Sequence, residues 1–509
     1  MKLLFTVLAA AATTIACGPQ YRLNMLEQRL VSASDRHDHR LAEHLAEELV
    51  ERTHEKSGPI SLEYRDALRK QAHVLAENDR GQLALDTMQK SLELDVAFFG
   101  SGDYRLEQGY YELATIQFGL EQREAAKRSI DTAVELCNHI SDADRSTFVC
   151  GLMSEYGFSR HYRQLGLYER AEALLLSSEA RPFMPTPVTF EISGLSMLGD
   201  FYFEYGDLGK ALWYYEKSRK LWQAAVPPAE VGEHEVYRAR GGDISMSVVD
   251  TAHDFHSIAP RSLERLISVT DRLGRFGDSS RLRSEETDRW LDAPEAQLTI
   301  RRRIDFEMDT WRSPYRLALQ WQALGFYRWK RGLLGQAIES YETAMRWAEK
   351  EWEKHSIYER HFPYEDLLDG RLVLGDLYTA AARFSDAEAQ YRLFLDEVDR
   401  YFNVRHRWRL DGRARLAMLH HASGDHGHAL AAWNEYLRLA EQVRGKEHAE
   451  YAWGLHNLAE TKDALGESAE ARRLRARARI LWDEYAKAVA AVDDLPLPAT
   501  LKPYEALIK

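Results

Sequence analysis

The feature that most constrains the fold is an alanine that follows a turn and recurs along the chain. It stands at Ala84, Ala126, Ala171, Ala211, Ala337, Ala387, Ala429 and Ala471. Successive separations are 42, 45, 40, 126, 50, 42 and 42 residues. Self-similarity at such a period indicates stacked structural repeats. A single core stops growing near about 250–300 residues, so 509 residues would ordinarily form several domains, but a repeat array is not bound by that limit.

Other positions at fixed distances from the alanine support this interpretation. Twelve residues before it, all eight positions are small: Ala72, Ala114, Ser159, Gly199, Gly325, Gly375, Ala417 and Ala459. Five residues before it, five of the eight are glycine: Gly166, Gly206, Gly332, Gly424 and Gly466. Four residues after it, seven of the eight are bulky and apolar: Met88, Ile130, Leu175, Tyr215, Tyr341, Tyr391 and Trp433.

Each of these positions has a mechanical reason. Small residues allow two antiparallel helices to approach closely, and the bulky residue fills the groove between them. Glycine ends the first helix by adopting the left-handed conformation. The repeated unit is therefore predicted to be a helix, a tight turn and a second helix.

The segments resemble tetratricopeptide repeats (TPRs), especially the version of about 42 residues seen in kinesin light chains. The closest copies are Leu198-Gly199 with Tyr202, Gly206, Ala211 and Tyr215, and the stretch from Glu447 to Ala478. The resemblance implies an all-α fold, a right-handed α-solenoid of stacked antiparallel helix pairs. It also implies that the first helix of each pair lines a groove that holds a peptide or a partner helix.

The repeats suggest how the chain is divided. We expect a signal peptide at 1–16, a lipid tether and an N-terminal helix at 17–60, repeats at 61–221, degenerate repeats at 222–313, repeats at 314–484 and a C-terminal tail at 485–509. The 126-residue gap equals three periods of 42. Leu273-Gly274 followed by Ser279 looks like one degenerate repeat, whereas Gly241-Gly242 interrupts the helical pattern.

The start of the chain has the order of a secretory signal. Lys2 precedes an apolar run from Leu3 to Ala12, too short for a permanent membrane span. Thr14-Ile15-Ala16-Cys17 then resembles a bacterial lipoprotein signal, in which the cysteine is acylated, although Thr14 stands where that family usually has leucine. The resemblance implies lipidation at Cys17 and an outer-membrane lipoprotein facing the periplasm. Two alternatives are an ordinary cleaved signal and a cytoplasmic adaptor that retains its N-terminus.

The net charge and the cysteine content limit which partners and which covalent links are expected. The net charge of −13 argues against binding to nucleic acid. Besides Cys17, the chain contains Cys137 and Cys150, near the facing ends of two predicted helices. In a secreted protein they can form a disulfide, but two buried thiols fit equally well.

The expected function is binding of a protein or peptide partner, without catalysis, cofactor or metal. Candidate groove residues are Tyr156, Arg160, Arg163, Asp200, Phe203, Glu204, Phe326, Trp329, Lys330, Asp376, His456, Glu460 and Asp463. Aromatic residues beside arginine are typical of recognition surfaces. The alternative for Phe203, Phe326 and Trp329 is packing between repeats.

Two segments of the chain offer chemistry other than partner binding. His420, His421, Asp425, His426 and His428 form the densest group of potential metal ligands. They are interpreted as solvated turn residues, with His426 and His428 on faces different from that of His420. An alternative function places a ligand-binding or enzymatic site in the irregular segment 222–313.

Overall fold

The structure is a computed structural model that describes residues 19–35, 38–138, 152–177, 188–225, 263, 265–291, 301, 304, 314–352 and 365–489. The chain divides into two compact units. Unit 1 comprises Met1–Leu165 with Glu351–Pro363, and unit 2 comprises Gly166–Lys350 with Tyr364–Lys509. None of the described helices is both long and apolar enough to cross a membrane. The proposed signal 1–16, Cys17 and the tail beyond 489 lie outside the described residues.

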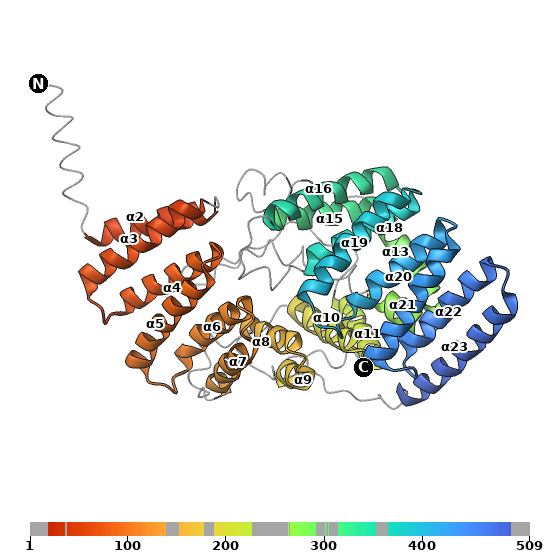
Figure 1. The fold of residues 1–509 in the computed structure, drawn as a ribbon, viewed down its shortest axis with the longest axis horizontal. Helices are drawn as coiled ribbons and strands as arrows, with labels where there is room; N and C mark the ends of the chain where they lie inside the picture. Colours follow the sequence, from red (N-terminus) through yellow and green to blue (C-terminus); the bar gives the residue numbers. More distant parts are fainter. Residues whose placement is uncertain are drawn as a thin grey trace, which may run out of the picture. The chain divides into compact units, whose positions relative to one another are not determined.

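Unit 1 is a row of antiparallel helices (Figure 1). They are α2 (Pro19–Asp35), α3 (His39–Ser57), α4 (Leu62–Glu77), α5 (Gly81–Phe99), the short 3₁₀ helix η1 (Tyr104–Leu106), α6 (Glu107–Gly119), α7 (Arg123–Asn138) and α8 (Leu152–Gln164). The segment 17–60, predicted to hold a lipid tether and one helix, contains the two helices α2 and α3, and Gly58 ends α3 with a φ of 80°.

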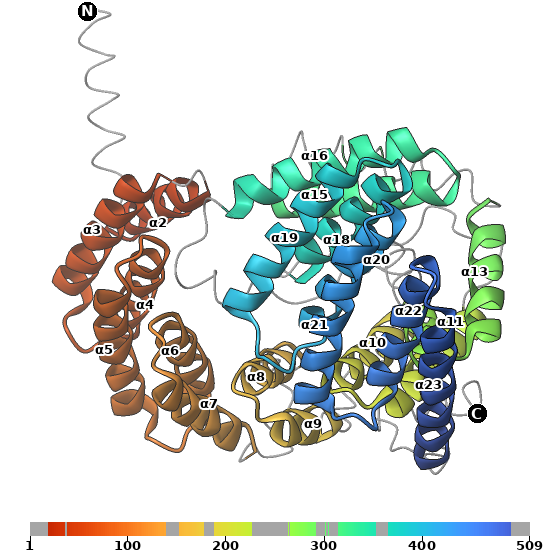
Figure 2. The ribbon, with the colours of Figure 1, turned by 45° about the vertical axis from the view of Figure 1, so that its right-hand side comes forward.

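Unit 2 continues the same pattern. Its helices are α9 (Tyr168–Ser177), α10 (Val188–Tyr205), α11 (Leu208–Ala225), α13 (Phe276–Leu291), α15 (Pro314–Lys330), α16 (Leu334–Trp352), α18 (Glu365–Ala380), α19 (Phe384–Tyr401), α20 (Trp408–Ala422), α21 (His426–Arg444), α22 (Ala449–Ala464) and α23 (Ser468–Val489). Residues 265–272 form a further helix before α13. Figure 2 shows α20 to α23 side by side.

The all-α fold of adjacent antiparallel helix pairs is confirmed. Each of the eight repeating alanines lies on the second helix of a pair and is completely buried. The predicted degenerate repeat is also present. Residues 265–272 and α13 flank Gly274, which has a φ of 70°, and Ser279 at the alanine position is 2% exposed. The pairs therefore pack through the small residues that the spacing identified.

Glycine and tyrosine are matched across three of the pairs. Where the small residue of the first helix is glycine, the bulky residue of the second helix is tyrosine: Gly199 faces Tyr215, Gly325 faces Tyr341 and Gly375 faces Tyr391. A Cβ at Gly199 would lie 2.6 Å from the Tyr215 ring. Real Cβ atoms do not approach other atoms so closely, so the larger ring requires glycine opposite it.

The turn between paired helices has one conformation throughout. The residue five before each repeating alanine has a positive φ in all eight repeats. Five of these residues are the predicted glycines, and the other three are Asp79, Glu121 and Ala382, with φ values of 59°, 58° and 56°. The fold thus imposes the left-handed conformation even where a side chain makes it unfavourable.

Candidate interaction surface

The first candidate surface is the predicted groove of unit 2, called here its inner side, to which Phe203, Asp200 and Asp376 are assigned. The prediction that Phe203 lines an open groove is wrong. Phe203 lies on α10 and has no exposed surface. The guanidinium groups of Arg272 and Arg407 lie 5.8 Å and 4.8 Å from the centre of its ring. The residue cannot be part of an open groove, because arginines of later repeats cover it. The packing alternative applies here.

Arg272 is the centre of these contacts. Its Nη1 donates to Oε1 of Glu450 at 2.9 Å, and its Nη2 donates to Oδ1 of Asp411. Its guanidinium also lies 4.6 Å from the centre of the Trp453 ring. The side chains of Arg272, Asp411 and Glu450 are 4%, 5% and 0% exposed. Helix 265–272 is therefore joined to α20 and α22 by a buried ionic contact.

Each charge in this contact favours the ionised form of its partner. Burial acts to raise the pKa of Asp411, but Arg272 and Arg407 outweigh it and hold the pKa well below its ordinary value. Burial acts to lower the pKa of Arg272, and the Asp411 carboxylate reverses that effect, so its pKa is raised overall. Both groups stay ionised at neutral pH. Removing either one would leave its partner buried among other charges.

Two predicted groove carboxylates are also engaged within unit 2. Asp200 accepts from Tyr215 Oη at 2.6 Å and lies 3.2 Å from Nε of Arg265. Asp376 accepts from Tyr391 Oη at 2.7 Å and from Nε of Arg415 at 3.0 Å. These carboxylates therefore hold the inner side of unit 2 together.

The C-terminal end of α10 is capped by residues from the last repeats. Arg444 donates to the carbonyl oxygens of Glu204 and Tyr205, the latter at 2.7 Å. Nδ1 of His448 accepts from the amide of Glu450 at 3.1 Å, so the neutral ring carries its proton on Nε2 and donates it to the carbonyl of Gly206 at 2.5 Å. Burial lowers the pKa of His448. The ring is therefore neutral at pH 7.

Three other predicted groove residues form a small cluster on α15. The rings of Phe326 and Trp329 meet edge to face with centres 6.4 Å apart. Nζ of Lys330 lies 4.8 Å and 4.9 Å from the two ring centres. Phe326 is 9% exposed, whereas Trp329 and Lys330 are half-buried. Packing dominates for Phe326, and the other two residues reach the surface of unit 2.

The predicted groove residues of unit 1 are on α8. Arg160 and Arg163 are half-buried, and the side chain of Tyr156 lies outside the described residues. Beside them, His161 is fully buried and its ring centre lies 5.1 Å from that of Tyr111 on α6. Aromatic packing therefore fixes α8 against α6, and the two half-buried arginines lie on either side of His161 in the sequence of α8.

His456, Glu460 and Asp463 on α22 are not clustered with the other candidates. His456 stacks on Phe276 with ring centres 5.0 Å apart. Glu460 and Asp463 both pair with Arg475, the one repeat position that is not apolar. These contacts again stay within unit 2.

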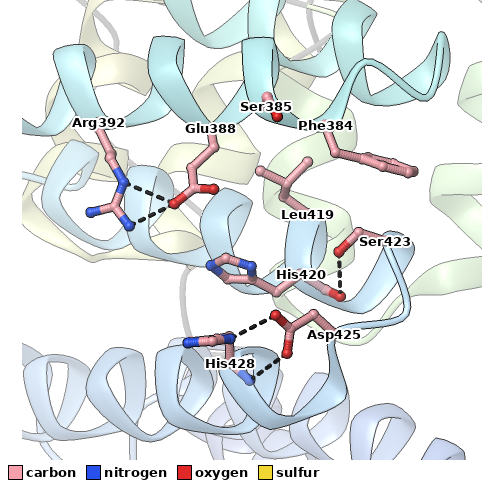
Figure 3. Close-up of a pocket in the computed structure, with 9 residues that line it drawn as sticks. All are labelled: Phe384, Ser385, Glu388, Arg392, Leu419, His420, Ser423, Asp425 and His428. Carbon is pink, nitrogen blue, oxygen red and sulfur yellow. Dashed lines mark hydrogen bonds and ion pairs between the residues drawn. The ribbon is translucent and has the colours of Figure 1, made fainter.

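The histidine-rich turn forms a pocket of about 260 Å³ between α19, α20 and α21 (Figure 3). The predicted separation of its histidines is wrong. The ring centres of His420 and His428 are 5.4 Å apart, and those of His421 and His426 are 5.2 Å apart. The tight turn brings the last turn of α20 against the first turn of α21.

Exposure and pairing limit what this pocket can bind. The side chain of His428 is 74% exposed and its Nδ1 lies 2.6 Å from Oδ2 of Asp425. Glu388 pairs with Arg392 in the same pocket, as Figure 3 shows. In the part of the chain that the structure describes, no three histidine, cysteine, aspartate or glutamate residues are grouped as metal ligands.

Cys137, at the end of α7, is disulfide-bonded. Cys150 lies outside the described residues. The pairing of Cys137 with Cys150 stays a prediction.

Comparisons with known proteins agree with the repeat architecture. No family model and no curated protein matches the chain. Among solved structures, it is similar to the TPR-like repeats of a protein described as a kinesin light chain from Podosopora anserina, with 17% identity, 45% of this chain and 96% of the other covered, and a TM-score of 0.33. It is also similar to a Rap protein complexed with Competence and Sporulation Factor, with 12% identity, coverages of 84% and 99%, and a TM-score of 0.39.

A third similar structure is BtubC from P. vanneervenii, with 15% identity, 48% of this chain and 87% of the other covered, and a TM-score of 0.30. The antiparallel helix pairs of this chain resemble the repeats of these proteins. At such identities and TM-scores the likeness concerns the repeat alone and carries no argument about partners.

Proposed function

We propose that this protein is a non-catalytic, lipid-anchored scaffold of the bacterial cell envelope that binds another protein. Two features support the proposal. The N-terminal pattern that ends in Cys17 supports acylation and an outer-membrane site facing the periplasm. The stacked helix pairs support binding, because repeat arrays present extended surfaces to partners.

The choice of binding site rests on one observation: several predicted groove residues of unit 2 are occupied by contacts within that unit. Phe203, Asp200 and Asp376 all contact other repeats of the same unit. We therefore propose that the partner binds unit 1, where Arg160 and Arg163 are half-buried on α8. Arginine on a rigid aromatic support is a frequent composition of binding hot spots.

Metabolic labelling with a fatty acid tests the anchor. The native protein is expected to incorporate the label, and Cys17→Ala is expected to lose it. A variant that changes Cys137 to alanine is the matched control and should keep the label. Equal labelling of the native protein and Cys17→Ala would refute the anchor.

Photo-crosslinking in cells tests the partner. A benzophenone amino acid at position 163 on α8 should yield one discrete protein adduct, identified by mass spectrometry. The same probe at the exposed Arg128, on the second helix of the preceding pair, is the control and should not. Identical adducts from both positions would contradict a binding surface on the first helices of unit 1.

A further inference from the structure

The first described helix, α2, has an exposed face unlike those of the other described helices. One side of α2 is buried: Leu23, Leu26, Leu30 and Ala33 pack in a core that includes Leu45 and Leu49 of α3. α2 and α3 lie together at the N-terminal end of the row of helices in unit 1 (Figure 1). α2 packs on one side only, since its opposite face carries exposed residues.

That opposite face is apolar and cationic. Tyr21, Met25 and Val31 are 54%, 40% and 59% exposed, so α2 has more exposed large apolar residues than any other described helix. Arg29 is exposed beside them. Tyr21, Met25 and Gln28 follow one another at intervals of four and three residues and so form one stripe along the helix.

α2 also carries little negative charge, although the chain contains 80 acidic residues. Of the two carboxylates of α2, Asp35 is the last residue of the helix and the other is that of Glu27. Its Oε1 lies 2.8 Å from Nζ of Lys70 on α4, so it is directed toward the neighbouring helices. Anionic lipid headgroups attract exposed arginine by about 1 kcal/mol per residue.

The covalent structure places this face near a membrane. α2 begins at Pro19, two residues after Cys17. Two residues span at most about 7 Å. The headgroup layer on each side of a bilayer is itself roughly 5–8 Å thick. If Cys17 is acylated, the first turn of α2, which carries Tyr21, must lie within or directly on the headgroups.

We infer that α2 is a membrane-contact helix, whose outward face of Tyr21, Met25 and Arg29 rests on the lipid headgroups and orients unit 1 on the bilayer surface. This inference rests on the proposed lipid anchor. Tyrosine suits the interface, because its ring is apolar and its hydroxyl can bond to headgroups. Met25 and Val31 add apolar contact, and Arg29 adds attraction to lipid phosphates.

Photo-crosslinking to lipid tests the inference in the full-length protein. A benzophenone amino acid replaces Gln28, at the C-terminal end of the stripe, and mass spectrometry identifies the adducts. The matched control carries the probe at Gln82, which is exposed on α5. The probe at position 28 is expected to give phospholipid adducts that the probe at position 82 does not. Tyr21→Ser combined with Met25→Ser should reduce the adduct yield several-fold.

Fatty-acid labelling of the same samples separates this inference from the anchor. Labelled protein without lipid adducts at position 28 overturns the membrane-contact face, and leaves the anchor intact. Adducts to another protein, or to a second copy of this chain, overturn it as well and identify the occupant. Lipid adducts without fatty-acid label support the face and refute the anchor. Absence of both refutes both.

Discussion

Ala382 is the residue at which the repeat architecture and local conformational preference disagree most plainly. It is exposed in the turn between α18 and α19 and has a φ of 56°. For a residue with a Cβ atom, the left-handed conformation costs about 1–2 kcal/mol. Glycine avoids that cost but loses about 0.4–1 kcal/mol through the greater freedom of its unfolded chain. Ala382→Gly is therefore expected to increase the free energy of unfolding by about 0.5–1 kcal/mol.

Urea unfolding followed by tryptophan fluorescence measures the effect. With a slope of about 3 kcal/mol per molar urea, the midpoint of unit 2 should rise by roughly 0.2–0.3 M. Gly424→Ala provides the reverse change, because Gly424 has a φ of 81° and no atom lies within 4 Å of a Cβ built there. The urea midpoint of Gly424→Ala should fall by a similar amount, because the substitution adds backbone strain without a steric clash.

Ala389→Gly is the matched control. Ala389 is exposed inside α19, seven residues after Ala382, where the backbone is helical. The same chemical change should there lower stability by about 1 kcal/mol. If Ala382→Gly lowers the midpoint as Ala389→Gly does, the left-handed conformation does not limit stability in this turn, and the argument from the repeated φ values fails.

Three further predictions concern unit 2. Arg272→Ala should destabilise unit 2 by about 3 kcal/mol. This value is at the low end for a broken buried ion pair, because Arg407 remains paired with Asp411. An unchanged urea midpoint would contradict the buried contact. The pKa of His448 in the folded protein is below its usual 6.5. As the pH falls through about 6.5, His448 therefore becomes protonated in the unfolded chain while it stays neutral in the folded protein. Stability should therefore decline from pH 7 toward pH 5, less so in His448→Gln, and equal slopes would refute this role. Gly199→Ala should destabilise unit 2 by about 1–2 kcal/mol, despite the better helix propensity of alanine, because Tyr215 leaves no room; a higher melting temperature would show that the ring can move.

The contacts of unit 2 bear on how the protein could act as a scaffold. Arg272 contacts Asp411 and Glu450, which lie 139 and 178 positions further along the chain, and Arg444 joins α21 to α10 across 239 positions. In a simple repeat array, each repeat contacts only the repeats next to it. These additional contacts couple distant repeats, so unit 2 is expected to unfold as one body.

Much of the fold could be predicted from the sequence, because helix pairing depends on residues at fixed short distances. Glycine at the turn and the small residue of the first helix act within a single repeat, and such local requirements leave a period. The degenerate repeat around Ser279 was found in the same way. The failures concern side chains whose partners belong to other repeats. Phe203 has the spacing of a groove residue, but Arg272 and Arg407 cover it.

The sequence by itself determined the helix pair, its tight turn and the stacking of copies, since each depends on the size and backbone freedom of residues within about 40 positions. The tertiary structure alone decided which inner positions are open to a partner and which are closed. Closure depends on Arg272 meeting Asp411 and Glu450 in a space from which water is excluded. A charged residue in a helix ordinarily faces solvent, so no pattern in the chain distinguishes these buried charges from surface ones.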